Sequence, residues 1–168
     1  YFLRGFNLDH GTDFAVYIDD MPMNFRTHGH GQGYLDVNGL IPETVRRVDY
    51  RKGPYRADTG DFSFVGSTAI TTHDRLDPFV LVEGGMYGYH RFVAGGSAEV
   101  GGGDLLLVGQ AKFYDGPWDL PEDFDGYSGF LKYSVPLGEG ELQASLNVFD
   151  ASWAPTERRS SWRTEAPS

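Results

Sequence analysis

The sequence predicts a mainly β protein built from two unlike parts, a mixed α/β region at residues 1–71 and long antiparallel strands at residues 79–168. Two observations support this prediction. The chain of 168 residues contains 23 glycines, 10 tyrosines and 12 phenylalanines, a mixture that favours twisted strands, tight turns and aromatic girdles. From residue 79 onward, apolar side chains recur at every second position, which is the period of a β-strand.

The first part begins with a short strand. Residues 14–18 form a β-branched and aromatic run, and the turn-forming residues 19–22 end it. Residues 23–33 are rich in glycine and histidine and have no periodicity, so we expect a loop there.

A helical turn is expected to open the next segment, at residues 40–47. Pro42 suits a first helical position, and Glu43 favours the positive end of the helix dipole. Residues 48–51 then read as a strand, which Gly53 and the proline after it stop. Residues 72–78 are polar and end in proline, so we place a linker there.

Five strands are expected in the second part, at residues 79–87, 91–100, 105–114, 127–135 and 142–149. In the last of them, apolar Leu142, Leu146 and Val148 alternate with polar side chains at residues 143, 145 and 147. The later strands are about ten residues long, the length that a tilted strand needs to cross a bilayer.

The connections between these strands alternate in length. Residues 101–104 and 136–141 are short, whereas residues 115–125 and the tail after residue 150 are longer and carry tryptophan. Short turns on one side and long loops on the other are typical of outer-membrane barrels. A soluble sandwich can alternate in the same way, so this pattern alone leaves both architectures open.

Composition excludes several classes of function. A net charge of −10 argues against a nucleic-acid partner, because phosphate binding needs clustered lysine and arginine. The absence of cysteine excludes disulfides and thiolate sites. No apolar run approaches the ~18 residues of a membrane-spanning helix. The chain starts at Tyr1 without a signal segment and stops in a polar stretch, so we expect both ends to be cut.

Two segments could be mistaken for chemical sites. His28 and His30 could share a metal ion, but no third ligand follows at a recognisable spacing, and a polar loop is the favoured reading. The acidic segment at residues 115–125 could bind calcium or carry paired carboxylates. Pro117 and Pro121 break the spacing of a calcium loop, so an exposed, solvated loop is favoured. We therefore predict no metal site, no cofactor and no catalytic residue.

Several ordered motifs in the first part resemble one known family. The segments are LRGF at residues 3–6, VYIDDMP at 16–22, IPE at 41–43, VRRVDYRKGP at 45–54 and TGDFS at 59–63. Together they resemble the plug domain of TonB-dependent outer-membrane transporters. The resemblance implies that residues 1–71 are the later part of a plug. Residues 79–168 would then be the first four or five strands of an antiparallel transmembrane β-barrel, here incomplete.

The resemblance also implies roles for particular residues. In such plugs the loops near the apex face the substrate, and the corresponding positions here are Asn7, Asp9, His10, Arg26, His28, His30, Gln32 and Tyr34. Plug arginines in this family pair with glutamates on the barrel wall, and Arg4 and Lys52 occupy those latch positions. Lys52 departs from the pattern, because lysine lacks the bidentate fork of arginine.

The implied function is TonB-dependent uptake of a scarce solute, such as a ferric siderophore, cobalamin or a saccharide, across the bacterial outer membrane. The implied partners are that small-molecule or metal-chelate substrate, the TonB complex and outer-membrane lipid. The TonB-binding segment would precede Tyr1. The alternative reading is a soluble secreted all-β module that binds a ligand or carbohydrate through its aromatic and acidic loops.

Overall fold

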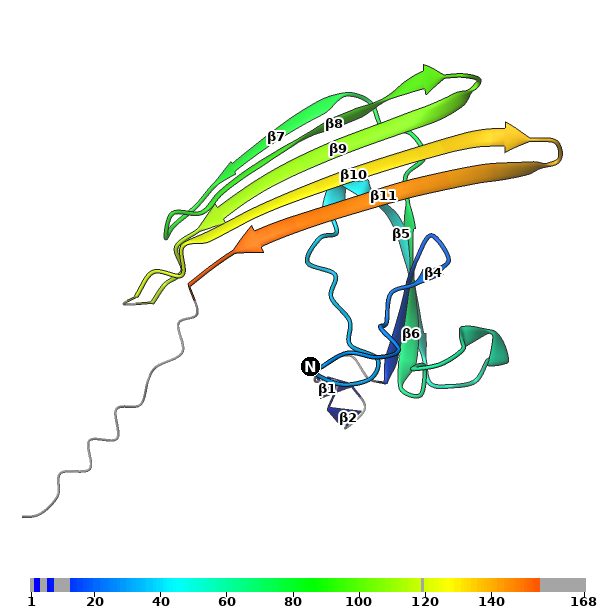
Figure 1. The fold of residues 1–168 in the computed structure, drawn as a ribbon, viewed down its shortest axis with the longest axis horizontal. Helices are drawn as coiled ribbons and strands as arrows, with labels where there is room; N and C mark the ends of the chain where they lie inside the picture. The colour runs from blue at the N-terminus through cyan, green and yellow to red at the C-terminus, as the bar shows by residue number, and fades with distance from the viewer. Residues whose placement is uncertain (1, 4–5, 8–12, 119, 155–168) are drawn as a thin grey trace, which may run out of the picture.

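The computed structural model describes residues 2–3, 6–7, 13–118 and 120–154. Most of the described chain lies in two β-sheets, and the larger sheet arches over the smaller one (Figure 1). The expectation of a mainly β protein is confirmed. No helix in the described part of the chain is long and apolar enough to cross a membrane.

The smaller sheet has the strand order β4-β3-β6-β5. Its strands are β3 (Phe14–Ile18), β4 (Met21–Pro22), β5 (Val45–Lys52) and β6 (Gly66–Thr72), and β1 (Phe2–Leu3) pairs separately with β2 (Phe6–Asn7). β3 runs parallel to β6, and the other pairs are antiparallel. The predicted turn after β3 is present, with Asp19 and Asp20 at φ 46° and 64°.

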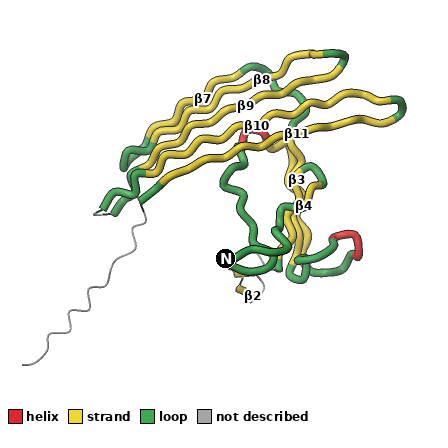
Figure 2. The backbone as a smooth tube through the Cα atoms, viewed as in Figure 1, coloured by secondary structure: helices red, strands yellow, loops and turns green. Residues whose placement is uncertain are grey.

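The mixed α/β character expected for residues 1–71 is not found in the described residues, where no α-helix occurs and the short red segments of Figure 2 are 3-10 turns. The predicted helical turn is a single 3-10 turn at Pro42–Thr44, and a second one lies at Ala57–Thr59. Thr44 closes the first turn by donating from Oγ1 to the Ile41 carbonyl at 2.7 Å. The following Val45 is already extended, which suits a β-branched residue. β5 therefore starts three residues earlier than predicted.

The larger sheet is an antiparallel meander in chain order. Its strands are β7 (Phe79–Gly84), β8 (His90–Val100), β9 (Gly103–Tyr114), β10 (Phe124–Leu137) and β11 (Gly140–Ser152). All five were predicted, and the observed strands differ mainly at their ends. The turns β8–β9 and β10–β11 are short and lie together at one end of the sheet (Figure 1). Gly101 and Gly102 both have positive φ, the requirement of a tight type I′ hairpin.

The two faces of the larger sheet differ in burial. On the face toward the smaller sheet, Val93, Leu106, Val108 and Phe130 form the core together with Ile41, which comes from the segment before β5. On the opposite face Leu107 is 58% exposed, although its neighbours along β9 are fully buried. Because successive side chains of a strand point to opposite faces, the predicted alternation is the direct cause of this difference.

Candidate binding site

The structure brings together three of the predicted substrate-contact residues. The ring of His28 stacks on Tyr34 at 4.1 Å between centroids, and His30 stacks on His28 at 5.5 Å. The loop is closed at its base by a backbone bridge between Phe25 and Tyr34. His28, His30, Arg26 and Gln32 are exposed, and Tyr34 is half-buried. No group of three potential metal ligands occurs among the described residues.

Of the predicted residues outside this loop, Asn7 and Lys52 are the ones that the structure describes. Arg4, Asp9 and His10 lie outside the described residues, and Asn7 is placed only as part of β2. Lys52 is exposed at the last position of β5, where it pairs with Gly66 at the start of β6. The latch that the family resemblance implies for Arg4 and Lys52 therefore stays a prediction.

An ion-pair cluster that the sequence did not reveal joins the smaller part to β8. Arg91 is only 9% exposed and donates from both terminal nitrogens to Glu43, at 2.8 and 2.5 Å. It also donates to Gln110 of β9 at 2.7 Å and to Glu83 of β7 at 3.2 Å. A bidentate guanidinium–carboxylate pair fixes orientation as well as distance. This cluster therefore aligns the 3-10 turn that carries Glu43 with the inner face of the sheet.

A second cluster surrounds Lys132 on β10, whose side chain is 2% exposed. Its Nζ lies 2.8 Å from Asp74 Oδ1, 3.3 Å from Asp19 Oδ2 and 3.1 Å from Thr72 Oγ1. Asp19 also accepts hydrogen bonds from the backbone and side chain of Thr72. The lysine thus ties the turn after β3, the end of β6 and the linker to the sheet.

In the predicted latch the cations belong to the plug and the carboxylates to the barrel wall, whereas both clusters have the reverse arrangement. The cations Arg91 and Lys132 belong to the larger sheet, and carboxylates of the smaller part, such as Glu43 and Asp19, pair with them. A signal was present in the sequence, since a charged residue at an inward position of an alternating strand needs a partner. The partner itself could not be read, because it lies 48 residues away in the case of Arg91.

These contacts predict a loss of stability in acid. Hydrogen bonding to Arg91 lowers the pKa of Glu43 below its usual 4.5. Burial raises the pKa of Asp74, but the hydrogen bond and charge of Lys132 lower it more, so that it lies below 3.8. A carboxyl with a lowered folded-state pKa contributes stability in full above its unfolded pKa and loses it as the pH falls through the folded value.

We therefore expect the free energy of unfolding to be nearly level from about pH 7 to about pH 5 and to fall below about pH 4.5. Urea titrations across this range should show a shallower acid loss in Glu43→Gln than in the parent protein. Equal acid slopes in the two proteins would contradict the assignment to Glu43.

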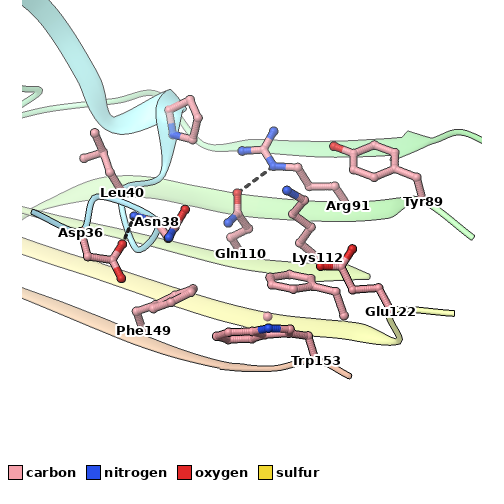
Figure 3. Close-up of a pocket in the computed structure, with 13 residues that line it drawn as sticks. Asp36, Asn38, Leu40, Tyr89, Arg91, Gln110, Lys112, Glu122, Phe149 and Trp153 are labelled. Carbon is pink, nitrogen blue, oxygen red and sulfur yellow. Dashed lines mark hydrogen bonds between the residues drawn. The ribbon is translucent and has the colours of Figure 1, made fainter. Parts of the chain in front are cut away.

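A cavity of about 530 Å³ lies between residues 36–42 and the inner face of the larger sheet, near its long-loop end (Figure 3). Gly39 approaches the sheet closely, because a Cβ there would lie 2.9 Å from Cβ of Phe149 on β11. Asp36 accepts a hydrogen bond from the Asn38 backbone at 2.8 Å and so shapes this segment. The segment thus forms one wall of the cavity, and four strands form the other.

The cavity combines an aromatic wall with polar groups. Phe124 and Trp153 stack at 6.5 Å between centroids, and Nζ of Lys112 lies 5.6 Å from the Phe124 ring. Asn38 and Gln110 supply amide groups, and Asp36, Glu122 and Tyr89 complete the polar lining. Such a mixture of apolar surface and a few converging polar groups is typical of small-molecule sites.

The sequence placed the substrate contacts at Asn7, Asp9, His10 and in residues 26–34, and this cavity was missed. Only the long, tryptophan-bearing connections pointed to this end of the sheet, and Trp153 follows β11 there. The remaining lining residues come from segments that meet through strand pairing or through the packing of residues 36–42 on the sheet. The sequence could not rank them above other aromatic or polar residues.

Comparison with known proteins supplies no family for this chain. A scan against models of protein families and a search of curated proteins both find no match. Function must therefore be inferred from the motifs, the fold and the cavity.

Proposed function

We propose that this protein is part of a TonB-dependent transporter of the bacterial outer membrane and takes up a scarce solute. In this proposal residues 1–71 belong to a plug domain, residues 72–78 link it to the wall, and residues 79–168 contribute the first wall strands. The ordered motifs of residues 3–63 support the plug assignment. The five-stranded meander that follows supports the assignment of the wall.

The observation that carries the proposal is the apolar, exposed outer face of the larger sheet. At least one outward residue on each strand is apolar and more than a third exposed: Val80 (78%), Phe92 (46%), Leu107 (58%), Leu131 (37%) and Leu146 (59%). A soluble monomer rarely exposes a continuous apolar surface of this extent. A lipid-facing barrel wall requires one.

Aromatic residues support the same orientation. On the outer face Phe113 packs against Tyr127 at the long-loop end, with ring centroids 6.0 Å apart. Tyr133 lies six positions further along β10, about 20 Å away at the rise of a strand. Aromatic residues near both ends of an apolar band match the girdles of outer-membrane barrels.

The sheet edges imply further strands. β7 and β11 each pair on one side only within the described residues. Unpaired backbone groups are not tolerated in lipid, so a membrane wall containing these strands must be closed by others. In the proposed mechanism the solute enters from the long-loop side, and the smaller part blocks the way through. Force transmitted by the TonB complex then displaces the smaller part, which the ion pairs of Arg91 and Lys132 hold to the larger sheet.

The alternative, a soluble secreted binding module, is favoured by the cavity and its aromatic wall. It leaves the apolar outer face without a function. Soluble behaviour without detergent would support it, whereas recovery with the outer membrane would exclude it.

Three experiments in the natural host test the proposal: fractionation of the protein, sequencing of the flanking DNA and disruption of the gene. The product should fractionate with the outer membrane, and the DNA on both sides of the coding segment should encode a signal peptide, a TonB-binding segment and further alternating strands. Growth on one scarce nutrient should fail in the disrupted strain and equally in a strain without TonB. A soluble product encoded by an isolated short gene would overturn the proposal.

A further inference from the structure

We propose that the cavity between residues 36–42 and the larger sheet binds a neutral, polyhydroxylated ring of the saccharide class. This inference rests on the proposed transport function, because it names the class of solute for that function. Three features of the cavity support it: its charge balance, its aromatic wall and its hydrogen-bonding groups.

The charge balance disfavours an anion. Arg91 and Lys112 are the cations of the cavity lining, and Asp36 and Glu122 are its carboxylates. Arg91 is already paired with Glu43 and Glu83, two further carboxylates. Two cations against four carboxylates leave a formal charge of −2 around the cavity. An anionic metal chelate would meet a repulsive field there, whereas a neutral solute would not.

The aromatic wall offers a platform for a ring. Trp153 is 57% exposed and lies nearly parallel to Phe124, with 29° between the two planes. The face of an aromatic ring carries partial negative charge and attracts the weakly positive C–H groups on one face of a sugar ring. Nζ of Lys112 lies over the Phe124 ring, so the aromatic wall already interacts with one positively charged group.

The polar groups suit hydroxyls. Asn38 and Gln110 can each donate and accept, and Asp36 and Glu122 accept only. They come from the segment opposite the sheet, from β9 and from the loop before β10, so they reach the cavity from different elements (Figure 3). Hydroxyl groups act as donors and acceptors at once and can satisfy both kinds of partner. Gln110 already accepts from Arg91 and Asp36 from the Asn38 backbone, and an apolar solute would leave the remaining hydrogen-bonding capacity of these groups unused.

The test uses the protein at the full length that its gene encodes, purified in detergent and applied to a printed array of neutral and acidic oligosaccharides. A ferric tricatecholate and cyanocobalamin are tested in parallel by tryptophan fluorescence. We expect retention on at least one neutral oligosaccharide and a loss of at least about tenfold in affinity for Trp153→Ala. Trp118→Ala is the control, because Trp118 is similarly exposed at 60% and lies outside the cavity.

Trp153→Phe separates stacking from folding, since it keeps an aromatic face and should retain most of the affinity. Binding only to acidic glycans, only to the ferric complex or cobalamin, or to none of these probes would overturn the saccharide assignment. Uptake in the host would then still support transport. Conversely, the protein could bind a neutral glycan and yet be absent from the outer membrane. This result would overturn the transport proposal and would still support the saccharide assignment. Unchanged glycan binding by Trp153→Ala would remove the cavity from the proposal.

Discussion

Replacing Lys132 by methionine is expected to lower the free energy of unfolding by about 3 kcal/mol, the cost typical of breaking a buried ion pair by removing one partner. Lys132 is 2% exposed and compensates the charges of Asp19 and Asp74. Methionine has a similar length but no charge, so Asp19 would lose this cation and Asp74 would keep only the more distant Arg46, at 3.7 Å. Because Asp74 is 31% exposed, water can solvate part of its charge, which places the loss at the lower end of the range. Denaturant titration followed by tryptophan fluorescence measures the change.

Lys112→Met is the matched control for this experiment. Lys112 lies on the same inner face of the neighbouring strand β9, and no carboxylate in the described part of the chain forms an ion pair with it. Its replacement should change the free energy of unfolding by less than about 1 kcal/mol. Combining Lys132→Met with Asp74→Asn should recover part of the loss, because one uncompensated charge is removed. A Lys132→Met protein as stable as the parent would show that the cluster does not join the two parts.

Replacing Leu107 by arginine is expected to cost about 3 kcal/mol if the outer face meets lipid, because the charge would enter the middle of the hydrocarbon layer. Leu107 points outward at mid-strand on β9 and pairs with Leu131 on β10. The measurement is equilibrium unfolding of the full-length protein from phospholipid vesicles. A parallel measurement is the amount of folded protein recovered from the outer membrane.

Leu137→Arg is the control, since Leu137 faces the same side at the last position of β10 and is 67% exposed. There the charge would lie near the membrane interface, where it costs less than about 1 kcal/mol. In a soluble protein both leucines would be solvated, and both replacements would change stability by less than about 0.5 kcal/mol. Equal, small effects at the two positions would therefore contradict the transporter proposal directly.

The sequence predicted the strands of the larger sheet well because their signal is local. Tyr127, Leu131 and Tyr133 alternate with buried Ser128 and Lys132, and strand geometry alone sends such neighbours to opposite faces. The turn at Asp19 and the strand before it were predicted for the same reason. The helical turn at residues 40–47 was overestimated, because Pro42 and Glu43 mark a helix start without determining its length. Ile41, the residue directly before this turn, packs into the core.

The candidate site was predicted only in part. The stacking of His28 on Tyr34 is a contact within one loop, and the sequence placed both residues among the substrate contacts. The cavity was missed, since Asn38, Gln110 and Trp153 are far apart in the chain and meet through strand pairing and through the approach of Gly39 to Phe149.

The sequence by itself determined the mainly β character of the protein, the number and order of the long strands, and the alternation of their side chains between two faces. These properties follow from side-chain periodicity and turn residues, which act over a few neighbouring positions. Only the tertiary structure decided how the smaller part docks. The pairs Arg91–Glu43 and Lys132–Asp19 join distant segments, and a charge in a sequence shows that it needs a partner without showing which one. Tertiary packing alone therefore decided which part carries the cations of this contact and where the cavity lies.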